Sequence, residues 1–510
     1  MKHLTPAQSL EIARQQIAEL FEMHAEWFHL VDDAPSHALK RSELDIAISH
    51  GALILSCWTE RGTRSWKISS WKWNGEKLIF RASRRMGAER PMIELIPRAA
   101  ATALAATVKA ARLVRCDRLA QLASQQLSGT RIEGVTLSPG IRRGQPGRYA
   151  RIVLRLKHQR IAVTASVASH FAADADGFLS AALLWFTRAS ERARPPYIQQ
   201  LWLIGEGELV KATLARLPLL REGLKESISV FAIDDAWSEL QALSIPSRND
   251  LWRKRLSRFP PLADTQTSQW TKSIAAQEPE AIDVVQARYG ETVRYLGLPF
   301  ARIRRLMGSE RVWFGIDGSS RTLLDVQNVD QLNRLVEDLR EHRSPNAVDL
   351  RHALYRNASE AWLESILRRD ISRLDPGLIV APLHAQFRTA HSGRLGVKPV
   401  DLLALRQDGR LVVIELKVSE DREHVLQGVG YWQRVEAHRR RGHITRAKLF
   451  GDRRINDEPP LVYLVAPMLR VHRAFSTLAR FIAPDIEIYR FDINEDWRAG
   501  VKVTRRMRAN

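Results

Sequence analysis

Two stretches of this 510-residue chain, far apart in the sequence, repeat one order of apolar strands and turns. The segment RIVLRLKHQRIAVTASV at 151–167 aligns without gaps on DLLALRQDGRLVVIELK at 401–417. Downstream, Trp185 aligns on Trp432, and a second pair of tryptophans follows in the same order. Matches that keep their order along a chain are typical of duplicated structural units. We therefore expect a tandem duplication in which one α/β domain occurs twice.

The length of the chain predicts several domains, because 510 residues exceed what one hydrophobic core can organise. Alternation of Trp, Ile and Leu with polar residues predicts antiparallel β modules, and Ala/Leu-rich stretches predict helices. In chain order we expect a helical segment at 1–38, a β-rich module at 39–100, an α/β domain at 101–240, a linker at 241–280, a second β-rich module at 281–345 and an α/β domain at 346–510. The two α/β domains are the expected copies.

Charge and cysteine content limit the partners and the compartment. Lys and Arg number 78 and Asp and Glu number 57, which leaves a formal net charge of +21. Such an excess favours polyanions as partners, with nucleic acid ahead of an anionic membrane; the alternative is a generally basic surface.

Two cysteines exclude a disulfide scaffold or a Cys-rich zinc module and fit a reducing cytoplasm. The most apolar run is too short to span a bilayer, so we expect a cytoplasmic protein without a membrane partner.

Residues 400–417 predict a β-hairpin that turns at an Asp-Gly pair. Asp401 stands at the start of its first strand. Glu415 and Lys417 share one face near the end of its second strand, because side chains alternate along a strand with period two. A hairpin places the start of one strand beside the end of the other. The pattern therefore predicts that these charged side chains converge.

Convergence of these groups suits the hydrolysis of phosphodiester bonds. The carboxylates of Asp401 and Glu415, with the backbone carbonyl of Leu416, are ligands that suit Mg²⁺ or Mn²⁺. Lys417 could orient or deprotonate a metal-bound water and offset charge on the transition state. The alternative interpretation is a surface Asp beside an ordinary Glu–Lys pair at a strand end.

A helix is expected after the hairpin, in REHVLQGVGYWQRVEAHRRR. Gln427 and Tyr431 are four residues apart and share a face of this helix. Its later part is basic and suits contacts with phosphates, through Arg434, His438, Arg439, Arg440 and Arg441. The alternative is a solvated basic helix without a ligand.

A second helix is expected before the hairpin, in ASEAWLESILRRD, where Ser359 can cap its N-terminus. Glu360 and Glu364 share a face of this helix, and either could point a further acid at the site. The alternative is a glutamate that favours the positive end of the helix dipole.

The order of a helix Glu, Asp401, Glu415 with Lys417, and the QGVGY element resembles the PD-(D/E)XK phosphodiesterase superfamily. The Q-x-x-x-Y spacing is similar to that of its RecB-like branch. Val400 stands where the family name has Pro. The resemblance covers about residues 350–500 and implies an αβββαβ restriction-endonuclease-like core with Mg²⁺-dependent nuclease activity.

The resemblance also implies roles for individual residues. Asp401 and Glu415 would be metal ligands, and Lys417 would be the catalytic lysine. Gln427 and Tyr431 would be accessory residues, and the helix Glu a supporting acid. The superfamily also contains inactive members.

The first copy lacks this polar set. Under the alignment, Asp401, Glu415, Lys417, Gln427 and Tyr431 fall on Arg151, Ala165, Val167, Ser180 and Leu184. Scaffold residues match while the charged cluster is confined to the second copy. We therefore expect the first copy to be a degenerate, inactive one.

The favoured function is a metal-dependent nuclease, with DNA ahead of RNA, whose first half binds or positions the substrate. The alternatives are a catalytically silent nucleic-acid-binding protein and a scaffold in a repair or defence complex. The chain carries no helicase signature, so processive action would need a helicase or another repair or defence partner. Endo- or exonucleolytic action, sequence specificity and oligomeric state stay open.

Overall fold

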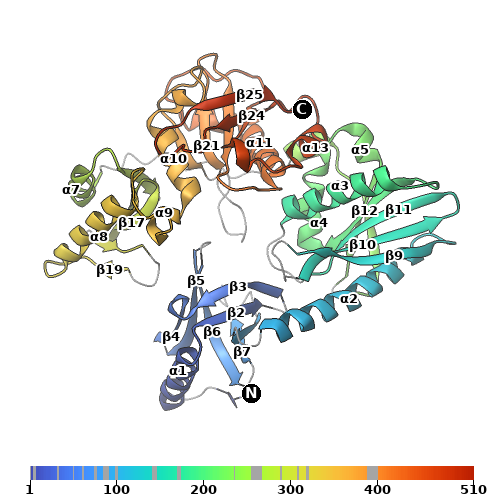
Figure 1. The fold of residues 1–510 in the computed structure, drawn as a ribbon, viewed down its shortest axis with the longest axis horizontal. Coiled ribbons are helices and arrows are strands. Elements are labelled where there is room, and N and C mark those ends of the chain that lie inside the picture. The colour runs from blue at the N-terminus through green and yellow to red at the C-terminus, as the bar shows by residue number, and fades with distance from the viewer. Residues whose placement is uncertain are drawn as a thin grey trace.

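The computed structural model belongs to the mixed α/β class, as predicted, and its described part contains four β-sheets with packed helices (Figure 1). It describes residues 2–3, 7–31, 34–49, 51–59, 62–73, 77–83, 91–97, 101–140, 146–168, 174–234, 236–253, 267–287, 290–306, 309–316, 321–387 and 400–510. Residues 254–266 of the predicted linker lie outside this set.

The first sheet is antiparallel and follows the order β3-β2-β8-β7-β6-β5-β4, with β1 paired to β6. Its elements are β1 (Lys2–His3), α1 (Ala7–Glu22), β2 (Glu26–Val31), β3 (Ala34–Lys40), β4 (Leu44–Ser49), β5 (Ala52–Thr59), β6 (Gly62–Trp73), β7 (Leu78–Ser83) and β8 (Met92–Pro97). The expectation of a helical segment over 1–38 is wrong after Glu22. Trp27 and His29 are buried and alternate with more exposed neighbours, which is the period of a strand.

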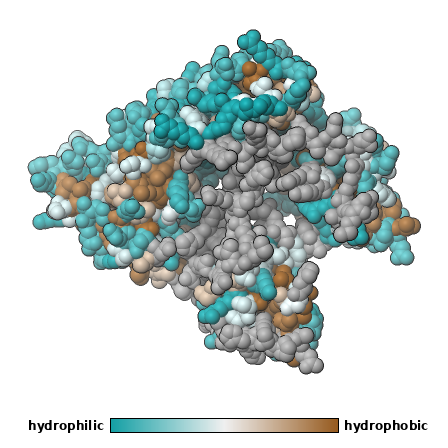
Figure 2. Space-filling model, turned by 180° about the vertical axis from the view of Figure 1, so that it is seen from behind, coloured by the Kyte–Doolittle hydropathy of each residue, from teal (hydrophilic) through white to brown (hydrophobic). Residues whose placement is uncertain are grey.

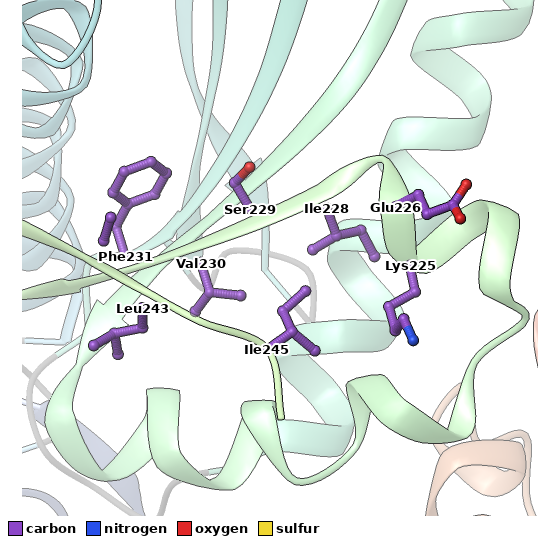
Figure 3. A pocket seen from close by; sticks show the side chains of 9 residues that line it. Lys225, Glu226, Ile228, Ser229, Val230, Phe231, Leu243 and Ile245 are labelled. Atoms are coloured by element: carbon purple, nitrogen blue, oxygen red, sulfur yellow. The ribbon is translucent and has the colours of Figure 1, made fainter. Parts of the chain in front are cut away.

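The second sheet follows the order β14-β13-β12-β11-β10-β9. Its elements are α2 (Ala101–Gln125), β9 (Arg131–Pro139), β10 (Pro146–Leu156), β11 (Gln159–Ser166), α3 (Ala175–Arg192), β12 (Ile198–Glu206), α4 (Gly207–Leu214), α5 (Glu222–Glu226), β13 (Ile228–Ile233) and β14 (Leu240–Leu243). A pocket at its β13–β14 edge is lined by residues such as Ile228, Phe231 and Ile245 (Figure 3). None of the predicted site residues lines that pocket.

The last sheet has the order β20-β21-β22-β23-β24-β25. Its elements are α10 (Ser359–Arg369), β20 (His384–Phe387), β21 (Val400–Leu405), β22 (Leu411–Leu416), α11 (His424–Arg440), β23 (Leu461–Pro467), α13 (Phe475–Arg480), β24 (Ile488–Ile493) and β25 (Val503–Arg508). In the second sheet β12 pairs parallel with both β11 and β13, and in the last sheet β23 pairs parallel with both β22 and β24. The other neighbouring strands of both sheets pair antiparallel. The two α/β units thus share one topology, which is what a duplication requires.

The gapless alignment of the two hairpins is wrong by one residue along the second strand. In the first hairpin Arg151 pairs with Thr164, and the pair Leu156–Gln159 closes a two-residue turn. In the last hairpin Leu402 pairs with Ile414, so one step further in the same register Asp401 lies opposite Glu415. The longer turn of the last hairpin causes the displacement. Glu415 therefore corresponds to Thr164, and by the same step Lys417 corresponds to Ser166.

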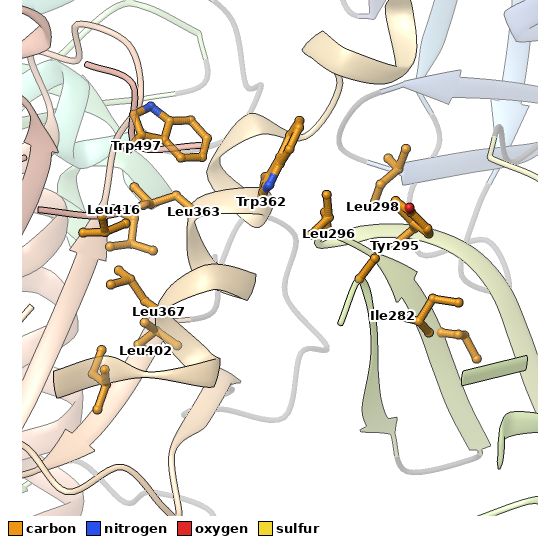
Figure 4. Close-up of a cluster of buried hydrophobic side chains, with 14 of the residues drawn as sticks. Ile282, Tyr295, Leu296, Leu298, Trp362, Leu363, Leu367, Leu402, Leu416 and Trp497 are labelled. Atoms are coloured by element: carbon orange, nitrogen blue, oxygen red, sulfur yellow. The ribbon is translucent and has the colours of Figure 1, made fainter. Parts of the chain in front are cut away.

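A third, antiparallel sheet precedes the last α/β unit. Helix α6 (Arg248–Arg253) precedes this sheet in the chain but packs through Leu251 in the buried cluster that contains α3 and α11. The module of the third sheet consists of α7 (Gln269–Gln277), β15 (Ile282–Ala287), β16 (Gly290–Tyr295), β17 (Leu298–Leu306), β18 (Ser309–Phe314), β19 (Thr322–Leu323), α8 (Val329–His342) and α9 (Ala353–Arg356). Trp362 and Leu367 of α10 join one hydrophobic cluster that contains Tyr295 on one side and Leu402 on the other (Figure 4). The expected boundary at 345/346 therefore crosses a continuous core.

The two α/β units also share a core with each other. Phe178 of α3 and Val429 of α11 belong to one buried cluster, and these helices occupy equivalent places in the two copies. The segments before β13 and before β24 pair through their backbones. The N–H of Arg221 donates to the carbonyl of Phe481, and the N–H of Ala483 donates to that of Leu219, both at 2.9 Å. Equivalent surfaces of the copies thus face each other.

Hydrophilic residues cover most of the coloured surface in Figure 2, and apolar residues gather in separate patches. Among the described residues, no helix has both the length and the apolar character needed to cross a bilayer.

Candidate active site

The hairpin brings Asp401 and Glu415 together under α11. Leu411 and Val413 of β22 pack in the cluster that contains Tyr431 of α11, so Glu415, two residues further, lies on the same face. The Oδ2 atom of Asp401 accepts a hydrogen bond of 2.9 Å from the backbone N–H of Leu416. This bond ties the start of β21 to the end of β22.

Lys417 forms a buried ion pair with Glu415. Its Nζ lies 2.7 Å from Glu415 Oε1, and the two residues are 6% and 1% exposed. The second oxygen, Glu415 Oε2, is buried and has no hydrogen-bond partner in the described part of the chain. Burial of a carboxylate oxygen without a partner costs free energy. The site therefore retains an unused ligand atom that a cation or a bound water would satisfy.

The acids and the lysine influence each other's protonation. Burial, followed by the charge of Glu415, raises the pKa of Asp401 well above its ordinary value. Burial acts to lower the pKa of Lys417, but Glu415, Glu360 and Asp401 outweigh it, and the pKa of Lys417 lies above its ordinary value. Lys417 is therefore a cation at neutral pH in this arrangement, which suits charge stabilisation better than proton abstraction.

Helix α11 supplies Gln427 and Tyr431 to the same space. Both are buried, and Gln427 Oε1 has no hydrogen-bond partner among the described residues. Burial and then the charges of Glu415 and Asp401 raise the pKa of Tyr431. The side chain of Tyr431 therefore lies close to the two acids. Gly428 lets the helix lie close to β23, because a Cβ there would meet a side-chain atom of Leu464 at 2.5 Å.

The two helix glutamates have different places. The charge of Glu360 acts on both Lys417 and Asp401, so this residue lies by the site. Glu364 is buried, and its Oε1 lies 3.0 Å from Nη1 of Arg294 in the neighbouring β-rich module. The structure therefore brings Glu360 to the acids and engages Glu364 in a structural ion pair.

Two residues near the site, and one that contacts the backbone before α10, were not predicted from the sequence. Asp421 Oδ2 lies 3.8 Å from Lys417 Nζ, and His424 Nε2 lies 3.2 Å from the carbonyl oxygen of Glu415. Burial and the charge of Lys417 lower the pKa of His424 to about 3, so it is neutral. Arg343 is fully buried and donates to the carbonyl of Ala358, directly before α10. The four-residue spacing of Lys417 and Asp421 was a usable signal; nothing local marked the other two.

The basic end of α11 makes mostly internal contacts. Arg439 Nε and Arg440 Nε donate to the buried carboxylate of Glu436 at 2.7 and 2.6 Å. Arg441 donates to the carbonyls of Ala437 and Trp252.

Two further basic residues of α11 are also engaged within the fold. His438 Nδ1 lies 3.0 Å from Nδ1 of His443, in α12 (His443–Arg446). The guanidinium of Arg434 stacks on the Tyr431 ring, 4.6 Å from its centroid. Burial and then Arg216 lower the pKa of Arg434 to about 10. Phosphate binding by the basic residues of α11 stays a prediction.

The residues fit a divalent cation that needs few protein ligands. Within the described ranges, no three His, Cys, Asp or Glu side chains form a group that could hold a metal ion. Mg²⁺ is commonly held by one or two carboxylates and keeps several waters. Asp401 and Glu415, with the unpartnered Oε2, provide such a pair. The role of the Leu416 carbonyl stays a prediction. No family model, curated protein or solved structure matches this chain, so the site itself carries the functional argument.

Proposed function

We propose that the last α/β unit is a nuclease of the PD-(D/E)XK type, with a restriction-endonuclease-like core, that hydrolyses phosphodiester bonds with Mg²⁺ or Mn²⁺. The observation that carries the proposal is the convergence of Asp401, Glu415 and Lys417 beneath α11, with one buried carboxylate oxygen unpartnered. The net charge of +21 favours a polyanionic substrate, for which DNA is the first candidate.

The residues of the site would divide the steps of hydrolysis. Asp401 and Glu415 would hold the divalent cation, which when bound lowers the pKa of water and stabilises charge on the phosphate. Lys417 would orient the attacking water and offset the negative charge that develops on the phosphate oxygens. Gln427 would accept a hydrogen bond from a water or a substrate group through its Oε1. Tyr431 would wall the site on the side of α11.

A second candidate function is catalytically silent binding of nucleic acid. The observation that favours it is the direct pairing of Lys417 with Glu415, which already neutralises one of the two acids. Under this alternative the chain binds nucleic acid without cleaving it, as a partner or scaffold in a repair or defence complex.

The test is a cleavage panel with the full chain. Supercoiled plasmid, single-stranded DNA, duplex DNA and RNA are incubated with Mg²⁺, with Mn²⁺ or with EDTA. We expect cleavage of at least one DNA substrate in either metal and none in EDTA. Salt-sensitive binding without cleavage of any substrate would support the silent alternative.

Matched variants assign the activity to the site. Lys417→Ala should lower the cleavage rate by about 100-fold or more. Lys448→Ala, at an exposed residue of the same domain that pairs on the surface with Asp452, should not change it. Unchanged melting temperatures of both variants would show that the fold is intact. Equal cleavage rates for the two variants would contradict the assignment of Lys417.

A further inference from the structure

The place of the candidate active site in the first α/β unit carries a different set of polar groups. Arg151 of β10 pairs with Thr164 of β11, at the positions that Asp401 and Glu415 hold in the last unit. Cross-strand partners lie on one face of a sheet. Ala162, two residues before Thr164, packs in the cluster that contains α3. Arg151 and Thr164 therefore face α3.

Helix α3 carries a hydroxyl and a guanidinium on one of its faces, with Leu184 between them. Ser180, Leu184 and Arg188 follow at four-residue spacing and share a face of the helix. The guanidinium of Arg151 lies over the ring of Trp185, 5.9 Å from its centroid, which places it against this helix. Arg188 is exposed, so the space opens to solvent at that end.

Two buried hydroxyl groups in this space lack hydrogen-bond partners. Thr164 is 1% and Ser180 is 0% exposed, and neither side-chain oxygen is hydrogen-bonded within the described ranges. A hydroxyl on a helix commonly donates to the carbonyl four residues earlier, as Thr187 of α3 does to Leu183 at 2.9 Å. Buried hydroxyls without partners cost free energy. Both groups are therefore available to a ligand that accepts hydrogen bonds.

Positive charge accumulates at the same place, with the acids Asp174 and Glu423 acting, together with Arg422, on Tyr149 two residues before Arg151. Burial, followed by the charges of Arg188 and Arg422, lowers the pKa of Arg151. Arg422 belongs to the last α/β unit, and its Nε is buried without a partner among the described residues. None of the three arginines forms an ion pair with a described residue. Like charges at close range repel each other, so an anion among them would be stabilised.

We propose that Arg151, Thr164, Ser180, Arg188 and Arg422 form a pocket that binds a phosphate group of the nucleic acid. Phosphate oxygens accept charge-assisted hydrogen bonds from guanidinium groups and further bonds from hydroxyls, which are the donors this pocket presents. The identification of nucleic acid as the source of the phosphate rests on the proposed function. The degenerate copy would thus have exchanged two acids that suit a cation for groups that suit an anion.

The chain connects this pocket directly to the candidate active site. Arg422 follows Asp421, whose Oδ2 lies 3.8 Å from Lys417 Nζ. Arg422 also precedes α11, the helix that carries Gln427 and Tyr431. A phosphate held by Arg422 and Arg151 would therefore fix the segment between β22 and α11. The pocket would hold one part of a bound strand while another part lies at the acids.

The experiment measures DNA binding without cleavage. The full chain carries Asp401→Ala, and binding of a fluorescent duplex and of a single strand is followed by anisotropy over a series of salt concentrations in EDTA. Arg151→Gln should weaken binding by about 10-fold and should reduce the slope of log Kd against log salt by about one. Arg155→Gln is the matched control, since Arg155 lies on the same strand, is half exposed and pairs with Glu133.

A second variant, with a side chain of the same shape, tests the pocket in case Arg151→Gln does not fold. Thr164→Val keeps the shape of the side chain, removes the unpartnered hydroxyl and should weaken binding while leaving the salt slope unchanged. A melting-temperature titration with inorganic phosphate and with a mononucleotide tests the other source of the phosphate group. Stabilisation by these small anions, together with unchanged DNA affinity of Arg151→Gln, would overturn nucleic acid as the ligand.

Two further outcomes distinguish failure of the pocket from failure of the nuclease function. Equal DNA affinity for Arg151→Gln, Thr164→Val and the Arg155→Gln control, without stabilisation by small anions, would overturn the pocket. A chain that never cleaves nucleic acid but loses DNA affinity in both pocket variants would refute the nuclease function and support the pocket.

Discussion

The two glutamates of α10 have different surroundings. Glu360 and Glu364 stand one helical turn apart on α10, yet only the charge of Glu360 acts on Lys417 and Asp401. Glu364 instead pairs with Arg294, which is itself buried and also bonded to Asp283. Helical periodicity places both on one face, but which of them reaches the acids depends on a module more than sixty residues upstream.

The two glutamates should respond differently to the same substitution. Glu360→Gln should lower the cleavage rate and leave the melting temperature unchanged, because the side chain is exposed and acts through its charge. Glu364→Gln should destabilise the chain by about 1–3 kcal/mol, because it weakens a buried charged hydrogen bond. Cleavage assays and thermal unfolding of both variants check this contrast. Loss of stability in Glu360→Gln, with none in Glu364→Gln, would reverse the assignment.

At the scale of elements, the hairpin of β21 and β22 could be predicted because apolar alternation and an Asp-Gly turn are local signals. The matching hairpin of β10 and β11 was also predicted, but its gapless alignment on the last hairpin was wrong by one residue because the turn lengths differ. Edge strands were harder to predict. Most residues of β9 are exposed or half-buried, so its sequence lacks the alternation that marks a half-buried strand.

The contacts at the end of α11 illustrate what a sequence pattern leaves open. Five basic residues predicted a phosphate-binding surface, and Glu436 within the same helix was the signal for another outcome. Its carboxylate is fully buried and accepts hydrogen bonds from Arg439 and Arg440. Whether a charged side chain meets solvent or a buried partner depends on tertiary packing, which helical spacing alone does not specify.

The close approach of α11 to β23 should be essential for placing Gln427 and Tyr431. Gly428→Val would put side-chain atoms against Leu464, cost about 1–3 kcal/mol of stability and lower the cleavage rate. Gly223→Ala is the control, because a Cβ at Gly223 of α5 meets no atom within 4 Å. Thermal unfolding and cleavage by both variants provide the comparison. A wild-type rate in Gly428→Val would show that this helix does not position the site.

At the scale of the whole molecule, the two α/β units behave as halves of one structure. They share a topology, one buried cluster and a pair of backbone hydrogen bonds between equivalent segments. Such an arrangement resembles a two-fold dimer whose subunits are joined in one chain. Through the shared core, packing in the copy without the acidic set contributes to the surroundings of α11 in the other copy.

The shared core predicts coupled stability of the two units. Phe178→Ala in α3 should remove about 3–5 kcal/mol and reduce hydrogen-exchange protection in α11 and β23 as well as in β11. Ile152→Ala is the control, because Ile152 packs on the other face of the second sheet, against α2. Its effect should be concentrated in the first unit. Identical protection patterns for the two variants would show that the shared cluster does not couple the units.

The measurement that tests the central claim most directly is the initial rate of DNA cleavage in Mg²⁺ by the wild-type chain and by Asp401→Ala. Asp401 joins the ends of β21 and β22 and is one of the two proposed metal ligands. We expect the wild type to cleave and the variant to lose activity by about 100-fold or more. The melting temperature of the variant should stay close to that of the wild type. Asp452→Ala, at an exposed aspartate of the same domain, should cleave at the wild-type rate. Equal rates for Asp401→Ala and the wild type would contradict the assignment of the active site.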